Sequence, residues 1–223
     1  MSTKRSKNAF PMPKMARPHV VWVSLISAMT AVGGALLLLD GRTATGSSAV
    51  ALASLNRPAD ADANFEALFA TAAPLEQGRW SGIVIHHSAS PVGSAASIAD
   101  QHTARGLKGL GYHFVISNGQ GAPDGQIVVG SRWQAQLPGA HVSGPRAEQY
   151  NRQTIGICLV GDGERREFTE AQVARLVELV TALQKKLGIP DRSVVLHRDV
   201  GPTSSPGRLF PELAFRQILS DTP

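Results

Sequence analysis

Two histidines each follow directly on a short apolar run. His86 comes after residues 83–85 (IVI), and His197 comes after residues 194–196 (VVL). Because short apolar, β-branched runs are typical of buried strands, we expect both imidazoles to lie at the ends of strands. Two imidazoles brought to one edge of a sheet are suited to hold a metal ion or to form an acid/base pair. Taken singly, each is more often a structural or surface histidine.

Strand and helix signals alternate between these two histidines. Residues 95–105 are compatible with a helix, and residues 112–117 alternate like a strand. The turn-forming pairs Asn-Gly at 118–119 and Asp-Gly at 124–125 come next. Residues 126–129 then return as the second strand of a hairpin.

The clearest predicted element is a helix over residues 169–187. Thr169 and Gln172 have the spacing of a capping box, and Gly188 and Pro190 end the helix. Its apolar face consists of Val173, Leu176, Val177, Val180, Leu183 and Leu187. Strands interleaved with helices, with a hairpin in the middle, predict an α/β fold in which a mixed central sheet is flanked by helices.

The first 39 residues differ from the rest in composition. They carry five basic residues and no acidic one, and residues 20–39 contain no charge. A helix needs roughly 20 apolar residues to cross a bilayer, and basic residues favour the cytoplasmic side. We therefore expect a basic cytoplasmic segment at 1–18 and a signal anchor in the inner membrane at 19–39. The alternative is a cleaved signal peptide with its cleavage site at 49–53, which would release the domain.

A tether and one exported domain are expected after the anchor. Residues 40–77 are dominated by Ala, Ser, Thr and Asp, which predicts a flexible tether that holds an extracytoplasmic domain at 78–223 off the membrane. The basic N-terminus accounts for the net charge of +5, because the remaining 17 basic residues equal the 17 acidic ones. A neutral domain without a basic stripe argues against nucleic-acid binding. We expect the domain to act as a monomer.

Cys158 is the only cysteine, which excludes an intramolecular disulfide and a cysteine-based metal cluster. It lies in the apolar run 154–160, where we expect a small buried hydrophobic residue. The chain also lacks the Gly-x-Ser-x-Gly and His-Glu-x-x-His motifs. The signatures of an elbow-type serine hydrolase and of a helix-borne zinc protease are therefore missing.

Several short segments, all in one order, resemble a known family. They are 83–89 (IVIHHSA), 111–116 (GYHFVI), 139–141 (GAH), 150–151 (YN) before 155–157 (IGI), and 197–200 (HRDV) running to 205–207 (SPG). In this order they resemble the zinc-dependent N-acetylmuramoyl-L-alanine amidases of type 2 and the peptidoglycan-recognition proteins that share their fold. The resemblance covers about Trp80 to Leu219.

The resemblance implies a role for four residues. His86 and His197 would be ligands of one zinc ion, and Tyr112 and Thr203 would assist catalysis. Zinc would polarise the amide carbonyl and lower the pKa of its bound water. Tyr112 and Thr203 would hydrogen-bond the attacking water and the developing oxyanion. The substrate would be the amide bond between N-acetylmuramic acid and L-alanine in peptidoglycan or its muropeptide fragments.

One position departs from the family pattern. Active members carry cysteine, or in some branches aspartate, eight residues after the second histidine, and this chain has Ser205. Zinc prefers thiolate, imidazole or carboxylate, so Ser205 would be a weak third ligand or a gap. Several recognition members carry serine there, which leaves a non-catalytic peptidoglycan-binding module as the alternative function. Asp199 is a conceivable substitute ligand, but it is more simply interpreted as structural.

The remaining polar candidates have two interpretations each. Arg132 would pair with a carboxylate of the stem peptide, or would be a solvated arginine beside a packed tryptophan. His141 would line the substrate cleft, or would lie on the surface. His113 should point to the face opposite Tyr112, because side chains alternate along a strand. His87 is more simply a structural residue or a support for a ligand.

Overall fold

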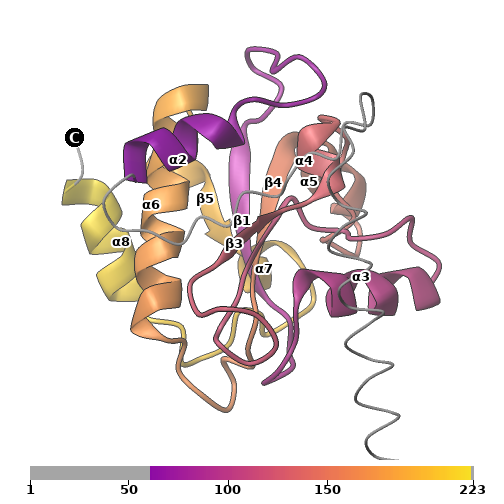
Figure 1. The fold of residues 1–223 in the computed structure, drawn as a ribbon, viewed down its shortest axis with the longest axis vertical. Helices are drawn as coiled ribbons and strands as arrows, with labels where there is room; N and C mark the ends of the chain where they lie inside the picture. Colours follow the sequence, from indigo (N-terminus) through magenta and orange to yellow (C-terminus); the bar gives the residue numbers. More distant parts are fainter. Residues whose placement is uncertain (1–60, 222–223) are drawn as a thin grey trace, which may run out of the picture. The chain divides into compact units, whose positions relative to one another are not determined.

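A five-stranded mixed sheet forms the centre of the domain in the computed structural model, which describes residues 61–221 (Figure 1). Its strand order is β3-β2-β4-β1-β5. The strands are β1 (Gly82–His87), β2 (Phe114–Ile116), β3 (Ile127–Val129), β4 (Thr154–Leu159) and β5 (Val194–Leu196). All neighbours are parallel except β2 and β3, which form an antiparallel hairpin. The predicted mixed sheet is thereby confirmed.

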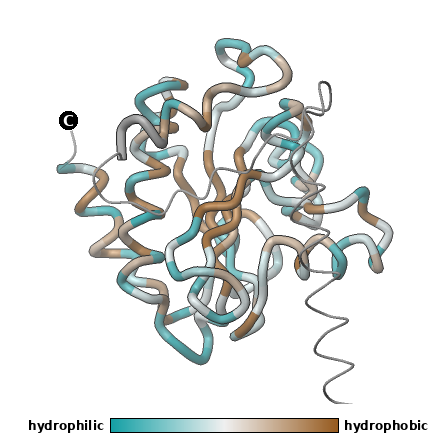
Figure 2. The backbone as a smooth tube through the Cα atoms, in the orientation of Figure 1, coloured by the Kyte–Doolittle hydropathy of each residue, from teal (hydrophilic) through white to brown (hydrophobic). Residues whose placement is uncertain are grey.

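Helices cover both faces of this sheet. Figure 1 shows α2, α6 and α8 together on one side and α3 on the other. The helical elements are α2 (Ala61–Leu68), α3 (Ala95–Ala104), α4 (Ser131–Gln134), α5 (Ala147–Gln153), α6 (Glu170–Leu187), η2 (Asp191–Ser193), α7 (His197–Val200) and α8 (Glu212–Asp221). Figure 2 shows hydrophobic residues concentrated along the central strands, as expected for strands covered on both faces.

The alternation of side chains along β1 decides which histidine faces which layer. Ile83 and Ile85 belong to the large core that includes the α6 and α8 side chains, whereas Val84 belongs to a separate cluster with Val142 and Val200. Since successive side chains of a strand point to opposite faces, His86 lies on the face of Val84. His87 correspondingly lies on the α6 side of the sheet.

The helix predicted at 169–187 is α6. Thr169 is its N-cap, and Thr169 and Gln172 form the predicted capping box, in which Thr169 Oγ1 accepts from the Gln172 backbone N–H at 3.0 Å. Gly188 ends the helix in the left-handed conformation, with φ of 70°. Glycine adopts this conformation without the steric cost that a Cβ atom would add. Both ends of the helix were therefore predicted from local sequence.

Part of the predicted tether is folded. Within 40–77, residues 61–68 form α2, and Phe65 and Leu68 are buried in the large core. The tether prediction was wrong over these residues, because apolar side chains on one helix face gain stability by packing against the core. The basic segment 1–18, the anchor 19–39 and residues 40–60 lie outside the described residues. No helix within residues 61–221 is long and apolar enough to cross a membrane.

The strand predicted at 112–117 is shorter in the structure. β2 begins at Phe114, and the backbone bends at His113. Tyr112 packs against the cluster that contains Cys158, whereas His113 contacts the ring of Trp80 at a centroid distance of 4.8 Å. The two side chains thus have different neighbours, and their placement on opposite faces stays a prediction, because neither residue belongs to β2. Cys158 is a free, fully buried thiol, as predicted.

We predict that Thr169→Ala lowers the free energy of unfolding by about 1 kcal/mol, because the Gln172 N–H at the start of α6 would lose its acceptor. Urea unfolding followed by circular dichroism measures this loss. Thr103→Ala is the matched control, since Thr103 is exposed near the end of α3 and its hydroxyl bonds the Ala99 carbonyl of its own helix. The control should change stability by less than about 0.5 kcal/mol. Equal effects in the two variants would contradict the assigned cap.

Candidate functional site

The structure brings the two predicted histidines together. His86 is the penultimate residue of β1, and His197 is the first residue of α7, directly after β5. Because β1 and β5 are adjacent and parallel, their carboxyl ends lie at the same edge of the sheet. The two imidazole centroids are 4.2 Å apart, with the ring planes inclined by 52°. The strand pairing therefore produces the predicted pair of imidazoles.

Burial keeps both imidazoles neutral. His86 has no exposed surface, and its pKa is held well below the usual value by desolvation first and then by the neighbouring His141 and His197. Burial likewise lowers the pKa of His197 to about 4, with a smaller contribution from His87. A neutral imidazole is the form that coordinates a metal ion, so both side chains are in the ligating state at neutral pH.

Each of these imidazoles has an unpaired buried nitrogen. Within residues 61–221, Nδ1 of His86 and Nε2 of His197 have no hydrogen-bond partner. A buried polar atom without a partner costs on the order of 1–3 kcal/mol, so such atoms are rare in folded proteins and call for an explanation. A bound ion is one of the standard explanations.

Tyr112 lies beside His86, with a centroid distance of 5.1 Å between the rings. Burial is the main cause that raises its pKa well above the usual value, so the phenol stays protonated at neutral pH and is able to donate a hydrogen bond. His102 of α3 is a further neighbour, 5.3 Å from the Tyr112 ring, and its Nδ1 accepts from the Gly111 N–H at 2.9 Å. His102 thus holds the segment that carries Tyr112.

Ser205 is buried, and its hydroxyl oxygen already accepts a hydrogen bond. It is 3% exposed, and its Oγ accepts a hydrogen bond from the backbone N–H of His87 at 3.0 Å. Its own N–H donates to Oγ1 of Thr203 at 3.1 Å. Thr203 itself is exposed, in the loop after α7. The structure therefore anchors Ser205 next to the end of β1, where the family pattern has its third ligand, and links Thr203 to it.

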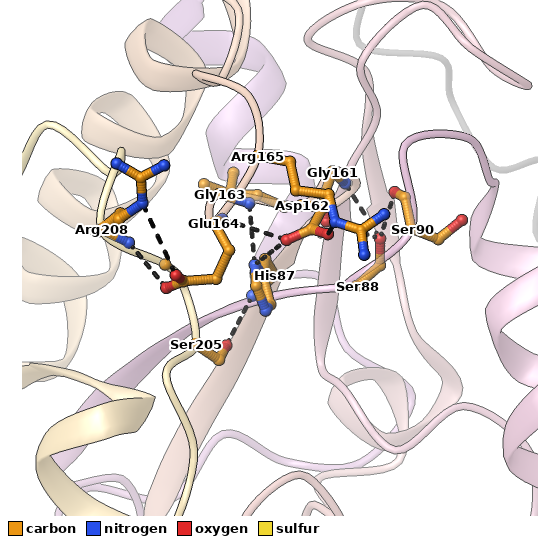
Figure 3. Close-up of polar contacts among 12 residues, drawn as sticks. His87, Ser88, Ser90, Gly161, Asp162, Gly163, Glu164, Arg165, Ser205 and Arg208 are labelled. Carbon is orange, nitrogen blue, oxygen red and sulfur yellow. Dashed lines mark hydrogen bonds and ion pairs between the residues drawn. The ribbon is translucent and has the colours of Figure 1, made fainter.

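A polar network supports this loop from the other side of β1 (Figure 3). His87 Nδ1 accepts from the Gly163 N–H at 3.0 Å, and Asp162 Oδ1 lies 3.9 Å from the same nitrogen. The Arg208 N–H donates to Glu164 Oε1 at 3.0 Å, which ties the segment after Ser205 to the loop after β4. His87 is therefore a structural residue in this arrangement, in agreement with its simpler interpretation.

The two predicted substrate-binding residues have different surroundings. Arg132 of α4 donates from Nε to the Leu110 carbonyl at 2.8 Å and from a terminal nitrogen to the Pro138 carbonyl at 2.5 Å. Two of its donors are thus used by the backbone. His141 is 7% exposed and lies in the site, with Nδ1 3.1 Å from His86 Nε2. The surface interpretation of His141 is therefore wrong, whereas a role of either residue in substrate binding stays a prediction.

Asp199 is a structural residue, in agreement with its simpler interpretation. Its carboxylate accepts from the Leu196 N–H at 3.0 Å and so caps the short helix α7 that begins at His197. A carboxylate near a helix N-terminus also interacts favourably with the unpaired backbone N–H groups there. Asp199 thus helps to orient the turn that carries His197.

Comparison with known proteins gives the class of this domain. Residues 76–208, more than half of the chain, match the N-acetylmuramoyl-L-alanine amidase family. The endolysin of Klebsiella phage KP32 is 31% identical over 134 residues, which cover 56% of this chain and 80% of the relative. Peptidoglycan-recognition protein LB of Drosophila melanogaster is 32% identical over 151 residues, which cover 62% of this chain and 60% of the relative. The class thus includes both amidases and recognition proteins.

Solved structures agree with this assignment. The N-acetylmuramoyl-L-alanine amidase LysC from Clostridium intestinale is 30% identical, with a TM-score of 0.55 over 67% of this chain and 92% of that one. A mutant of Drosophila PGRP-LB in complex with tracheal cytotoxin is 27% identical, with a TM-score of 0.51 over 66% and 83% of the two chains. The chain belongs to the N-acetylmuramoyl-L-alanine amidase family.

The family implies a zinc ion, and the residues present supply part of its site. The unpaired nitrogens of His86 and His197 provide two donors of the type that zinc prefers. Among residues 61–221, no group of three His, Cys, Asp or Glu side chains is placed to hold a metal ion. Ser205, the predicted third ligand, has a hydroxyl oxygen that already accepts from the His87 N–H.

We predict a pH dependence of stability that originates from His113. Burial lowers its pKa to about 4 in the folded chain, against 6.5 for an ordinary histidine. As pH falls below 6.5 the unfolded chain binds a proton that the folded chain does not, so stability decreases until about pH 4. Between pH 7 and 4.5, His113→Asn should lose about 2 kcal/mol less stability than the wild type. Urea unfolding of the metal-free protein at several pH values measures this difference.

His102→Asn is the control for this pH dependence, because His102 is only half-buried and its pKa is lowered less strongly. Its variant should follow the wild-type curve more closely than His113→Asn does. The same acid sensitivity in His113→Asn and the wild type would contradict the burial of a neutral His113.

Proposed function

We propose that this chain is a zinc-dependent N-acetylmuramoyl-L-alanine amidase, which hydrolyses the amide bond between N-acetylmuramic acid and L-alanine in peptidoglycan. The observation that carries this proposal is the pair of adjacent imidazoles of His86 and His197, each with an unpaired buried nitrogen. Their neutral state and their place at one edge of the sheet suit a metal ion. Membership of the amidase family supplies the reaction class.

Four residues of the chain would each have a distinct role in this hydrolysis. His86 and His197 would hold the zinc ion, which would supply Lewis-acid polarisation of the amide carbonyl and a water of lowered pKa. Tyr112, protonated at neutral pH and 5.1 Å from the His86 ring by centroid distance, donates a hydrogen bond to the developing oxyanion. Thr203 orients the attacking water, and its link to Ser205 fixes its position.

The proposed ligand is peptidoglycan or a muropeptide. Relatives of this chain are named for recognition of peptidoglycan, and one solved relative is a complex with tracheal cytotoxin. Arg132 would use its remaining donors for a carboxylate of the stem peptide. We also propose that the segment at 19–39 anchors the domain outside the cytoplasmic membrane, which is the side where peptidoglycan lies.

A second function, peptidoglycan recognition without cleavage, is favoured by Ser205. A neutral hydroxyl is a poorer zinc ligand than a thiolate or a carboxylate, and its oxygen already accepts from the His87 N–H. In this alternative the chain still binds the muropeptide, while the site binds zinc too weakly to support hydrolysis. The two functions differ in zinc content and in release of the stem peptide.

We predict that the purified chain contains about one equivalent of zinc and releases stem peptides from muropeptides. Elemental analysis measures the zinc, and mass spectrometry of the products detects the free stem peptide. Removal of zinc by a chelator should abolish release, and added zinc should restore it.

His86→Ala should lose both zinc and activity, because one of only two imidazole ligands disappears. A zinc-free chain that binds muropeptides without cutting them would contradict the amidase and establish the recognition function.

Ser205→Cys provides the sharper comparison, since it restores a thiolate at the third position. We expect tighter zinc binding in this variant, together with at least the activity of the wild type. Ser204→Cys is the matched control, because Ser204 is the exposed neighbour in the same loop and should change neither property. Activity in Ser205→Cys alone, with none in the wild type, would show that the natural chain only binds.

A further inference from the structure

We propose that His141 is a positioning residue that fixes the tautomer of His86, so that His86 presents an unprotonated Nδ1. Two contacts of the His141 ring support this role. Its Nδ1 lies 3.1 Å from Nε2 of His86, and its Nε2 lies 3.3 Å from the carbonyl oxygen of Thr154. The three groups thus form a chain of hydrogen bonds that ends at a backbone carbonyl.

The chemistry of the last group determines the direction of every bond in this chain. The Thr154 carbonyl is only able to accept, so Nε2 of His141 must carry the proton. A neutral imidazole has a single N–H, which leaves Nδ1 of His141 as an acceptor. Nε2 of His86 must therefore donate to it, and Nδ1 of His86 is left without a proton.

The neutral state that this argument requires follows from burial. His86 is fully buried and His141 is 7% exposed, and a charged imidazole is disfavoured in such surroundings. Nδ1 of His86 is moreover the nitrogen that has no hydrogen-bond partner within residues 61–221.

The His141 ring occupies a space that two glycines leave open. A Cβ atom on Gly156, in the middle of β4, would lie 2.5 Å from Cδ2 of His141. A Cβ atom on Gly139 would lie 2.6 Å from Nε2 of the same ring. Real Cβ atoms essentially never come so close to a ring, so any larger residue at either position would displace the imidazole. The ring therefore has a defined position relative to His86.

The backbone at His141 is fixed as well. Oδ1 of Asn151 accepts from the N–H groups of both His141 and Val142, at 2.8 Å and 2.9 Å. Nδ2 of Asn151 donates back to the Val142 carbonyl at 2.9 Å. One side chain thus satisfies three backbone groups of this loop. Gly139, Gly156 and Asn151 thus define the position of the ring and of its backbone.

The consequence for the site rests on the proposed function. An unprotonated Nδ1 is ready to bind a metal ion without first losing a proton, and a fixed ring needs no reorientation. Partners that orient a ligating histidine typically contribute 10- to 100-fold to metal affinity. This contribution would matter most in a site where Ser205 replaces a stronger ligand.

The first test is the tautomer of His86 in the metal-free full-length chain. Long-range proton–nitrogen correlation spectra at neutral pH distinguish the two neutral tautomers of histidine, and His86→Gln identifies the signals of His86. We expect the Nε2–H tautomer in the wild type. An Nδ1–H tautomer would overturn the proposal whether or not the protein binds zinc, so this result is independent of the amidase function.

Variants of His141 extend the test. His141→Ala should release His86 to a mixture of tautomers and weaken zinc binding about 10- to 100-fold, measured by competition with a chelator of known affinity. His141→Asn keeps an acceptor oxygen close to the position of Nδ1, so it should retain the Nε2–H tautomer. His113→Asn is the matched control, because His113 is equally buried and bonds only backbone groups. It should leave the tautomer unchanged.

The outcomes separate this proposal from the proposed function. If the wild type binds no zinc but shows the Nε2–H tautomer, the positioning role stands and the amidase fails. If zinc binds and His141→Ala keeps both the tautomer and the affinity of the wild type, the positioning role fails and the amidase stands. Should His141→Ala not fold, the wild-type tautomer and the His141→Asn variant still decide the question.

Discussion

The parallel pairing of β1 with both β4 and β5 is the constraint on which the site depends. Through β5 it brings His197 next to His86 at one edge of the sheet, and through β4 it places Gly156 beside β1. The missing side chain at Gly156 leaves room for the His141 ring on the sheet face that also carries His86. A change of register by one residue would turn His86 to the α6 side and His87 toward this face. The pairing thus sets which histidine faces His197 and which one joins the polar network of the neighbouring loops.

Two faces of β1 carry two different polar arrangements. On one face, His86 contacts the rings of His197, His141 and Tyr112, and His86 and His141 are buried. On the other, His87 joins the loop after β4 to the loop that contains Ser205. The backbone between them is shared, because the His87 N–H is the donor to Ser205. The loop that carries Ser205, the proposed third ligand, is therefore held in place at the end of β1.

Local sequence patterns were sufficient to predict α6 with its caps, β1, β5 and the convergence of His86 and His197. These features depend on side-chain periodicity and on the parallel arrangement of strands, which short segments specify. The burial of α2 was not predictable in this way, because Phe65 and Leu68 are stabilised by a core whose other members lie far along the chain. The bend at His113, the contact of His102 with Tyr112 and the seat of His141 between two glycines likewise depend on tertiary packing. The glycines in 139–141 and 155–157 were the only sequence signal for the position of the His141 ring.

The central claim is that the unpaired nitrogens of His86 and His197 form a zinc site. The most direct measurement is an anomalous difference map, collected at the zinc absorption edge, from crystals of the chain grown with one equivalent of Zn²⁺. The account predicts a single strong peak within bonding distance of both imidazoles, with Nδ1 of His86 as the donor on that ring. An absent peak, with both nitrogens bonded to protein groups or water instead, would contradict it.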